Sequence, residues 1–274
     1  MSFKQPIRTA AIAVRNILLG SNVASTALLA RPAELASYAT QALFLLDTLL
    51  RRRGLPERNV LEVLPGAPRH VPIELAGRQE GVWFGSLSPF LADLVGLCIL
   101  CRAIEPRTVF EIGTLNGYST LHLALNSPAD ATVYTLDLPS DGPGPSLGVT
   151  FSDVAHAARG SATTNYWFSG TEVEGKIRTL RGDSATFDFS PWRGKVDLFF
   201  IDGAHSYEYV KSDTERALEC LSPRGAIAWH DFGRRGVNGV SRCLRELAAQ
   251  GRRIYVVPGG SLAYGTGLSG PAPS

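Results

Sequence analysis

Cysteine is scarce in this chain of 274 residues, and its four copies do not form the loop-rich, closely spaced framework of a disulfide-stapled domain. Two of them, Cys98 and Cys101, lie in the apolar run LADLVGLCILCRAI, where a three-residue separation puts both thiols on one helix face. Cys220 and Cys243 also fall in helix-like or apolar runs. We therefore predict four reduced core cysteines rather than a redox or metal pair.

An excess of charge of either sign is also missing, because 27 Lys and Arg face 25 Asp and Glu. A nucleic-acid clamp needs a concentrated basic stripe for its phosphate contacts, so neither DNA nor RNA is an expected partner. Hydrophobic residues make up 45% of the chain and charged residues 19%, which is typical of a folded chain rather than a disordered one. The length suits one large α/β domain with a smaller appendage.

No apolar run reaches the roughly 18 residues that a membrane-spanning helix needs. Near the N-terminus, Lys4 and Arg8 precede the runs AAIAV and NILLG in the manner of a secretion signal, but Arg15 interrupts them. We expect no transmembrane segment and a cytoplasmic location. A peripheral membrane contact through residues 1–30 stays open.

Residues 33–53 carry apolar side chains at helical spacing and end in three arginines before Gly54, which predicts an amphipathic helix. The basic end suits the negative pole of the helix dipole. We expect residues 1–60 to form a helical extension and residues 61–274 to form the main domain. The apolar helix face either covers the main domain or meets a second copy, which would give a homodimer through the N-terminal helices.

From Ser88 onward, short apolar strands alternate with helices. Ser88-Pro89 is typical of a helix start, and Pro106 of a helix stop. Strands are predicted at 108–113, 132–138, 176–183, 196–202, 226–231, 253–257 and 261–265, and helices at 118–126, 207–221 and 237–251. This alternation predicts a Rossmann-like, doubly wound α/β fold, with a mostly parallel sheet of seven strands covered on both faces.

The stretch 139–174 interrupts the alternation and is rich in Gly, Pro, Ser and Thr. It is too long for an ordinary connection, so we expect an inserted lid or substrate loop. Its aromatic cluster Tyr166-Trp167-Phe168 either closes over a ligand or anchors the loop locally.

Acidic residues and glycines mark the ends of the predicted strands. In an open parallel sheet, ligands bind at the carboxyl ends of the strands, so these residues predict a ligand cleft. They are Glu111, Gly113, Gly117 and Ser119 after the first strand, Asp137 after the second, Asp183 and Ser184 after the third, Asp202 after the fourth, and His230 and Asp231 after the fifth. The glycines differ from the G-x-G-x-x-G pattern that admits a pyrophosphate, whereas Asp137 is placed to bind ribose hydroxyls. A nucleoside without a diphosphate fits this pattern.

The segment EIGTLNGYS at 111–119 resembles the cofactor loop of the class I S-adenosylmethionine-dependent methyltransferases. IDGAHSYEYVKSD followed by WHDF resembles a bacterial small-molecule O-methyltransferase subgroup, related to the macrolide-sugar (macrocin), cephalosporin-cluster and catechol O-methyltransferases. The resemblance runs from about Leu87 to the C-terminus. It implies transfer of a methyl group from S-adenosylmethionine to a hydroxyl of a small-molecule acceptor, such as a sugar or another specialised metabolite.

The resemblance also implies roles for the strand-end residues. Those expected around the cofactor are Glu111, Gly113, Gly117, Ser119, Asp137 for the ribose, Asp183 and Ser184 beside the adenine, and Asp202. In metal-using relatives the corresponding strand ends hold a divalent cation, which here gives Asp202, His230 and Asp231 as ligands. His230 departs from that pattern, because Mg²⁺ prefers oxygen ligands and imidazole suits softer metals. Mg²⁺, Mn²⁺ and Zn²⁺ stay open, as does a packing role for His230.

His205 lies three residues beyond Asp202, where the catechol-type relatives place a catalytic lysine. Methyl transfer from a sulfonium requires positioning of the two reactants and deprotonation of the attacking hydroxyl. A neutral histidine is a competent base, so we predict catalytic roles for His205 and Asp202. The structural alternative is that His205 caps the following helix or pairs with Asp231.

Two other functions stay open on the same fold. A nicotinamide-dependent oxidoreductase is disfavoured by the glycine spacing. A module that binds the cofactor without catalysis is disfavoured because a base beside two acids has no physical purpose in an inactive pocket.

Overall fold

The computed structural model describes residues 54–64, 66–76, 91–139, 142, 144–151, 153–154, 165–234 and 236–268, with a few short stretches between residues 14 and 50. The chain divides into two compact units, one formed by residues 1–46 with 80–87 and the other by residues 47–79 with 88–274. Apart from Leu46 and Leu50, the helix predicted at 33–53 lies outside the described residues. The division of the chain at residue 60 stays a prediction.

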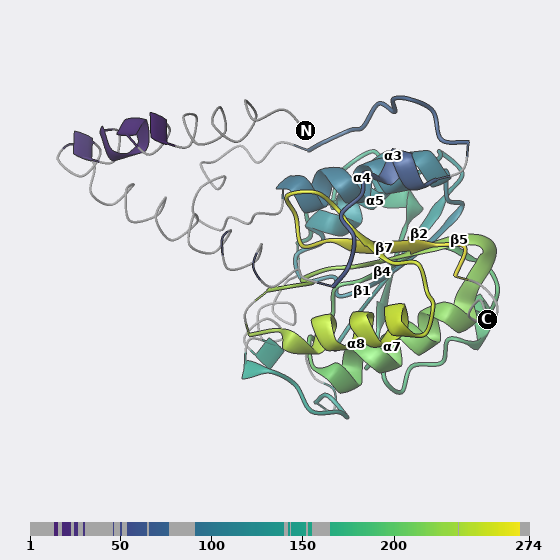
Figure 1. Cartoon of the computed structure of the whole chain (residues 1–274). Helices are drawn as coiled ribbons and strands as arrows, with labels where there is room; N and C mark the ends of the chain where they lie inside the picture. Colours follow the sequence, from purple (N-terminus) through teal and green to yellow (C-terminus); the bar gives the residue numbers. More distant parts are fainter. Residues whose placement is uncertain are drawn as a thin grey trace. The chain divides into compact units, whose positions relative to one another are not determined.

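The second unit contains one sheet of seven strands in the order β3-β2-β1-β4-β5-β7-β6. Figure 1 shows this sheet between two layers of helices. The strands are β1 (Thr108–Ile112), β2 (Thr132–Asp137), β3 (Ile177–Arg181), β4 (Val196–Ile201), β5 (Leu221–Trp229), β6 (Tyr255–Val256) and β7 (Ala263–Thr266). Neighbours among β1 to β5 pair in parallel, and β7 is antiparallel to both β5 and β6. The predicted Rossmann-like, mostly parallel sheet is confirmed.

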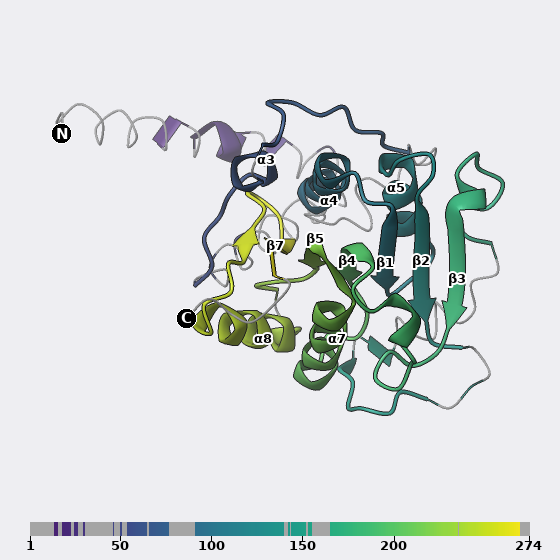
Figure 2. The ribbon, with the colours of Figure 1, turned by 90° about the vertical axis from the view of Figure 1, so that its right-hand side faces the viewer.

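Helices cover both faces of this sheet, as Figure 2 shows. On one face lie α3 (Val60–Val63), α4 (Leu91–Ile104) and α5 (Tyr118–Asn126), and on the other α7 (Tyr207–Cys220) and α8 (Asn238–Ala249). Two short 3-10 helices, η1 (Glu174–Lys176) and η2 (Ser190–Trp192), precede β3 and β4. Within the described part of the chain, each helix is too short or too polar to cross a bilayer.

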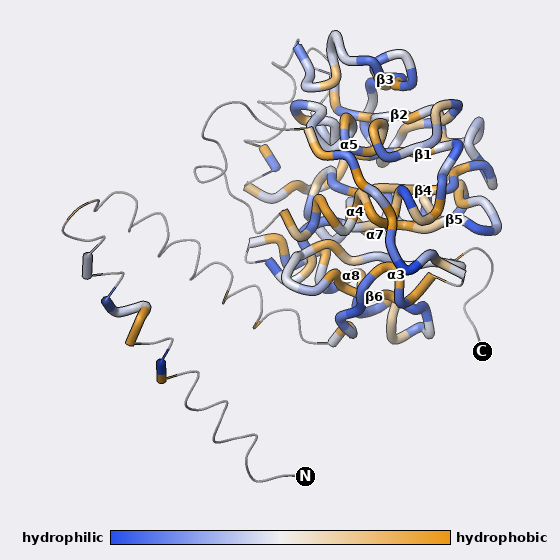
Figure 3. The backbone as a smooth tube through the Cα atoms, turned by 90° about the horizontal axis from the view of Figure 1, so that it is seen from above, coloured by the Kyte–Doolittle hydropathy of each residue, from blue (hydrophilic) through white to orange (hydrophobic). Residues whose placement is uncertain are grey.

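The core forms two layers, because successive side chains of a strand point to opposite faces of the sheet. In β4, Phe199 packs in the cluster with α7 and α8, whereas Leu198 and Phe200 pack in the cluster with α4 and α5. This two-sided burial explains why the central strands read as continuous apolar runs. The covering helices differ from these strands, because apolar and polar positions alternate along them in the hydropathy colouring of Figure 3. All four cysteines are buried and free, which confirms that prediction.

The start of β5 differs clearly from the predicted elements. We predicted a strand from residue 226, but β5 begins at Leu221, which pairs with Val196 before an irregularity in the register. Pro223 and Gly225 lie inside this stretch and are atypical of a strand interior. A Cβ on Gly225 would lie 2.8 Å from the carbonyl oxygen of Val196, so the close approach of the two backbones explains the glycine.

Candidate active site

The glycine turn between β1 and α5 lies directly against the end of β4. Gly113 and Gly117 have φ angles of 102° and 76°, which glycine adopts without steric cost. A Cβ on Gly113 would lie 2.1 Å from the backbone oxygen of Asp202, and one on Gly117 would lie 2.6 Å from the ring of Phe168. Both predicted glycines are therefore required by close approach as well as by their φ angles.

Asp137, at the end of β2, faces this turn. Its Oδ2 accepts the backbone N–H of Leu115 at 2.9 Å, and its Oδ1 accepts that of Leu138 at 2.9 Å. Burial raises the pKa of this carboxyl, although the two amides oppose the shift. An acid beside the glycine turn is the arrangement expected of a ribose-binding residue, and that role stays a prediction.

Glu111 and Ser119 hold the turn from inside the protein. The Glu111 carboxylate is fully buried and accepts the hydroxyls of Ser119, Thr120 and Thr135 at 2.6, 2.5 and 2.6 Å. Burial raises the pKa of Glu111 to about 7, against the effect of these hydrogen bonds. The two residues thus support the predicted cofactor loop through its internal hydrogen bonds.

Asp183 and Ser184 follow β3 and connect it to other parts of the site. Asp183 accepts the Tyr209 hydroxyl of α7 at 2.9 Å and the backbone N–H of Ser146, in the inserted segment, at 2.7 Å. Burial would raise the pKa of Asp183, but the hydrogen bonds outweigh it and lower that pKa. Ser184 is buried beside it. The contact of Asp183 and Ser184 with the adenine of the cofactor stays a prediction.

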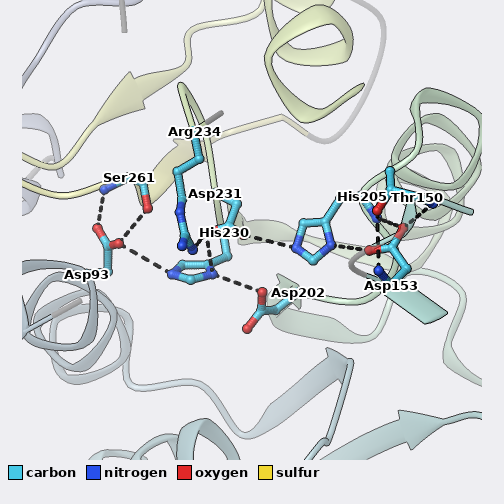
Figure 4. A network of polar contacts seen from close by, with 9 residues as sticks. All are labelled: Asp93, Thr150, Asp153, Asp202, His205, His230, Asp231, Arg234 and Ser261. Atoms are coloured by element: carbon cyan, nitrogen blue, oxygen red, sulfur yellow. Dashed lines mark hydrogen bonds and ion pairs between the residues drawn. The ribbon is translucent and has the colours of Figure 1, made fainter. Parts of the chain in front are cut away.

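Beyond β4 and β5, carboxylates and histidines alternate in one continuous network, shown in Figure 4. The carboxylates are Asp93, Asp153, Asp202 and Asp231; His205 and His230 lie between them, Arg234 binds Asp231, and Ser261 binds Asp93. These residues come from α4, the inserted segment, the ends of β4 and β5, and the segment between β6 and β7. The fold thus brings the predicted strand-end residues together with others that lie far away in sequence.

His205 bridges two of these carboxylates. Its Nδ1 lies 2.6 Å from Oδ1 of Asp153, and its Nε2 lies 3.1 Å from Oδ2 of Asp231, in an ion pair outside hydrogen-bond geometry. Burial lowers the pKa of the ring, but the hydrogen bond to Asp153 and the charge of Asp231 outweigh it and raise the pKa to about 10. His205 therefore carries a proton at neutral pH in this arrangement. To act as the predicted base, it must first release that proton.

His230 lies among three carboxylates. Its Nδ1 is 3.0 Å from Oδ1 of Asp202 and 3.1 Å from Oδ1 of Asp231, and its Nε2 is 3.3 Å from Oδ2 of Asp93. Burial opposes a charged ring, yet these acids raise the pKa of His230 well above its ordinary value. Burial of Asp231 is likewise outweighed, because His230, His205 and Arg234 lower the pKa of its carboxyl below the usual range.

The three predicted metal ligands are adjacent but do not fit a metal ion in this arrangement. Among the residues that the structure describes, no group of three or more His, Cys, Asp or Glu is placed to hold one. The donor atoms explain why: His230 Nδ1 carries a proton toward Asp202 and Asp231, and the guanidinium of Arg234 also binds Asp231. A divalent cation would have to displace that proton and share a carboxylate with a guanidinium. The predicted metal is therefore not supported.

Sequence reasoning missed Asp93 and Asp153. Asp93 is buried in α4, where its carboxylate accepts the backbone N–H of Ser261 and of Leu262 and the hydroxyl of Ser261, at 2.5, 2.7 and 2.7 Å. A single acid within the apolar run LADLVGLCILC was the available signal. Asp153 lies in the inserted segment, where no motif distinguishes it.

The aromatic cluster packs against the glycine turn. Phe168 is buried, Tyr166 stacks on it with ring centroids 4.9 Å apart, and the backbone N–H of Trp167 donates to the carbonyl of Asn116 at 3.0 Å. These contacts favour the anchoring role among the two that the sequence left open.

Comparisons with known proteins agree with this arrangement. Residues 110–232 match the sequence profile of a family described as a methyltransferase domain. The caffeoyl-CoA O-methyltransferase of Stellaria longipes is 25% identical over 173 residues, which cover 61% of this chain and 63% of that protein. The chain therefore matches less than two thirds of the length of this relative.

Two solved structures have lower similarity. The O-methyltransferase TomG of Streptomyces achromogenes, in complex with S-adenosylmethionine, is 19% identical with a TM-score of 0.42, over 80% of this chain and 93% of that chain. The O-methyltransferase of Bacillus cereus, in complex with S-adenosylhomocysteine, is 19% identical with a TM-score of 0.44, over 81% and 95%. The domain match spans every predicted strand-end residue, and the seven-stranded sheet carries these residues. The similarity of this chain to known methyltransferases at the level of sequence therefore lies in the domain match of residues 110–232.

Proposed function

We propose that the protein transfers the methyl group of S-adenosylmethionine to a hydroxyl of a small molecule, such as a sugar or another specialised metabolite. One observation carries this proposal: the glycine turn 113–117 and Asp137 lie at the same sheet edge as Asp202 and the acid–histidine network. The turn admits a ligand close to the backbone, and the neighbouring carboxylate suits ribose hydroxyls. The acids beyond it suit an acceptor hydroxyl.

The cofactor contacts that we propose follow the family resemblance. Gly113, Gly117 and the turn between them would contact the methionine part, with Glu111 and Ser119 as its internal support. Asp137 would bind the ribose, and Asp183 and Ser184 would border the adenine. The spacing of the two glycines does not suit the pyrophosphate of a nicotinamide cofactor, which disfavours the oxidoreductase alternative.

The reaction breaks the carbon–sulfur bond of the sulfonium, forms a carbon–oxygen bond to the acceptor and releases the hydroxyl proton to a base. Asp202 is the most exposed carboxylate of the network, with 27% of its side chain exposed, against 9% for Asp231 and 6% for Asp153. We therefore propose that Asp202 accepts the hydrogen bond of the acceptor hydroxyl. His205 is the second candidate for the proton acceptor, under the condition that it first loses its own proton.

The net charge of the network supports the binding of S-adenosylmethionine at this site. With its four carboxylates ionised and His205, His230 and Arg234 charged, the network has one net negative charge. A sulfonium carries one positive charge and is attracted to such a site. The histidines and the arginine supply the positive charge that a metal would otherwise bring to these acids.

Calorimetric titration with S-adenosylhomocysteine tests the proposal. We expect binding in the micromolar range in the presence of EDTA and no binding of NAD or NADP under the same conditions. Absence of S-adenosylhomocysteine binding in every condition would overturn the proposed function. Titration with Mg²⁺, Mn²⁺ or Zn²⁺ forms a separate arm: metal binding that is weakened in Asp202→Ala would restore the metal-assisted mechanism.

We also propose a cytoplasmic location and a homodimer formed through the helices expected in residues 1–53. Light scattering of the full chain should then give twice the mass of one chain. A monomer across the accessible concentration range would contradict the dimer, and recovery of the protein in a membrane or secreted fraction would contradict the location.

A further inference from the structure

Asp153 and His205 make a two-point contact across 52 positions of sequence. Oδ1 of Asp153 lies 2.6 Å from Nδ1 of the ring, and its Oδ2 accepts the backbone N–H of His205 at 3.1 Å. Both side chains are almost completely buried, with exposed fractions of 6% and 10%. One carboxylate therefore fixes both the backbone and the ring of the histidine.

This contact attaches the inserted segment to the turn between β4 and α7. Asp153 stands in the helical stretch that the structure describes at residues 151 and 153–154, and the backbone N–H of the preceding Thr150 donates to Oδ2 of Asp153 at 2.8 Å. A second attachment lies a few residues earlier, where the backbone N–H of Ser146 donates to Asp183 at 2.7 Å. Ser146 and Asp153 thus attach the inserted segment at the carboxyl edge of the sheet, to the residues that follow β3 and β4.

The direction of the histidine ring follows from this attachment. With Nδ1 held by Asp153, Nε2 faces Oδ2 of Asp231 at 3.1 Å, as Figure 4 shows. A carboxylate on one ring nitrogen fixes the orientation of an imidazole and determines which nitrogen carries the proton. The contact of His205 with the strand-end acids therefore depends on a residue outside every motif that the sequence analysis identified.

We propose that Asp153 is a positioning residue for His205, so that the inserted segment supplies part of the proton-handling machinery of the site. The catalytic consequence rests on the proposed function, but the positioning itself is measurable in the protein without a substrate. Replacing the carboxylate with an amide would leave Nδ1 without a charged acceptor and release the ring from its direction toward Asp231.

A purely local role for Asp153 can be separated from positioning. Its backbone N–H donates to the side-chain oxygen of Thr150 at 3.3 Å, and its carboxylate also accepts from the Thr150 backbone. Thr150→Val removes the first of these contacts and leaves the carboxylate of Asp153 in place. It is therefore a matched control that perturbs this helical stretch but not the contact with the ring.

The test is the nuclear magnetic resonance spectrum of the full chain labelled with ¹⁵N-histidine, with the His205 Nδ1–H signal assigned by its loss in His205→Gln. A buried proton that is bonded to a carboxylate exchanges slowly with water, so we expect the signal in the wild type and in Thr150→Val and its loss in Asp153→Asn. An unchanged signal in Asp153→Asn would overturn the proposal. If Asp153→Asn does not fold, Asp153→Glu provides the test. The longer Glu side chain should shift the His205 Nδ1–H signal. A signal at the wild-type position in Asp153→Glu would contradict the positioning role.

Titration of the same samples with S-adenosylhomocysteine separates this inference from the proposed function. Loss of the histidine signal in Asp153→Asn together with absence of S-adenosylhomocysteine binding by the wild type would overturn only the proposed function. Binding by the wild type together with an unchanged histidine signal would overturn only the positioning role.

Discussion

Asp93 and Ser261 are joined twice, because both the backbone N–H and the hydroxyl of Ser261 donate to the Asp93 carboxylate, at 2.5 and 2.7 Å. The same carboxylate lies 3.3 Å from Nε2 of His230. One buried acid on α4 therefore connects the helix, the segment before β7 and the end of β5. This connection places the edge of the sheet relative to the layer that covers it.

Asp93→Ala should destabilise the protein strongly. It leaves buried N–H groups of Ser261 and Leu262 without their acceptor and removes one carboxylate from the charged ring of His230, for which a loss of about 3–5 kcal/mol is expected. The measurement is the free energy of unfolding in urea. The control is Asp130→Ala, because Asp130 has an exposed side chain in a weak ion pair at 3.7 Å and should change that energy little. Equal effects of the two substitutions would refute this prediction.

Gly117→Ala should weaken the binding of S-adenosylhomocysteine and destabilise the fold. The added methyl group would lie 2.6 Å from the Phe168 ring, at a φ of 76°. Gly170→Ala is the matched control, because Gly170 has a φ of 74° but no heavy atom within 4 Å of the added carbon. Both variants carry about 1–2 kcal/mol of left-handed strain, so the difference in unfolding free energy between them measures the clash. No difference would show that the aromatic segment moves aside without cost.

Asp137→Ala should reduce the affinity for S-adenosylhomocysteine by roughly 10- to 100-fold, which is the effect of losing hydrogen bonds from ribose hydroxyls to a charged acceptor. Calorimetry gives the dissociation constant directly. Asp188→Ala is a suitable comparison, because Asp188 is an exposed acid whose carboxylate accepts the backbone N–H of the nearby Ser190 at 2.9 Å. An affinity that is unchanged in Asp137→Ala would remove this residue from the cofactor site.

Asp213 should make stability depend on pH. It is completely buried on α7, and burial raises the pKa of its carboxyl to about 7, against the smaller effect of Ser184. The folded state therefore binds this proton more tightly than the unfolded state. The contribution to stability is fully present below the unfolded pKa of roughly 4 and is lost as the pH rises through about 7.

Asp213→Asn removes this titration. We expect the variant to be more stable than the wild type at pH 8, by up to about 4 kcal/mol, and to lose that advantage near pH 4. Urea unfolding of both proteins across this range measures the difference. A difference that does not vary with pH would show that burial does not shift the titration of Asp213.

The sequence predicts the central strands well, because β1 and β4 are buried on both faces and their sequences are mostly apolar. It predicts the start of β5 poorly, because Pro223 and Gly225 oppose a strand locally and only pairing with β4 makes one. The same limit applies to the site. The strand-end acids were predictable from their place after apolar runs. Asp93 and Asp153 instead contact the site histidines, which are distant from them in sequence.

The predicted metal shows another limit of sequence patterns. Asp202, His230 and Asp231 do lie together, so the pattern placed the cluster correctly. It could not reveal that Arg234, three residues beyond Asp231, already binds one of these carboxylates. Charge compensation of this kind depends on where a long side chain reaches, which residue order does not specify.

The close approach of Gly113 to the backbone of Asp202 also limits how the protein can be redesigned. Because a Cβ on Gly113 would lie 2.1 Å from that carbonyl oxygen, no side chain separates the turn from the end of β4. Substitutions there would displace the cofactor turn and Asp202 together, which makes this edge a poor place to alter acceptor preference. If the proposed methyl transfer holds, a library that changes the acceptor should keep this edge constant and vary the inserted segment outside Asp153.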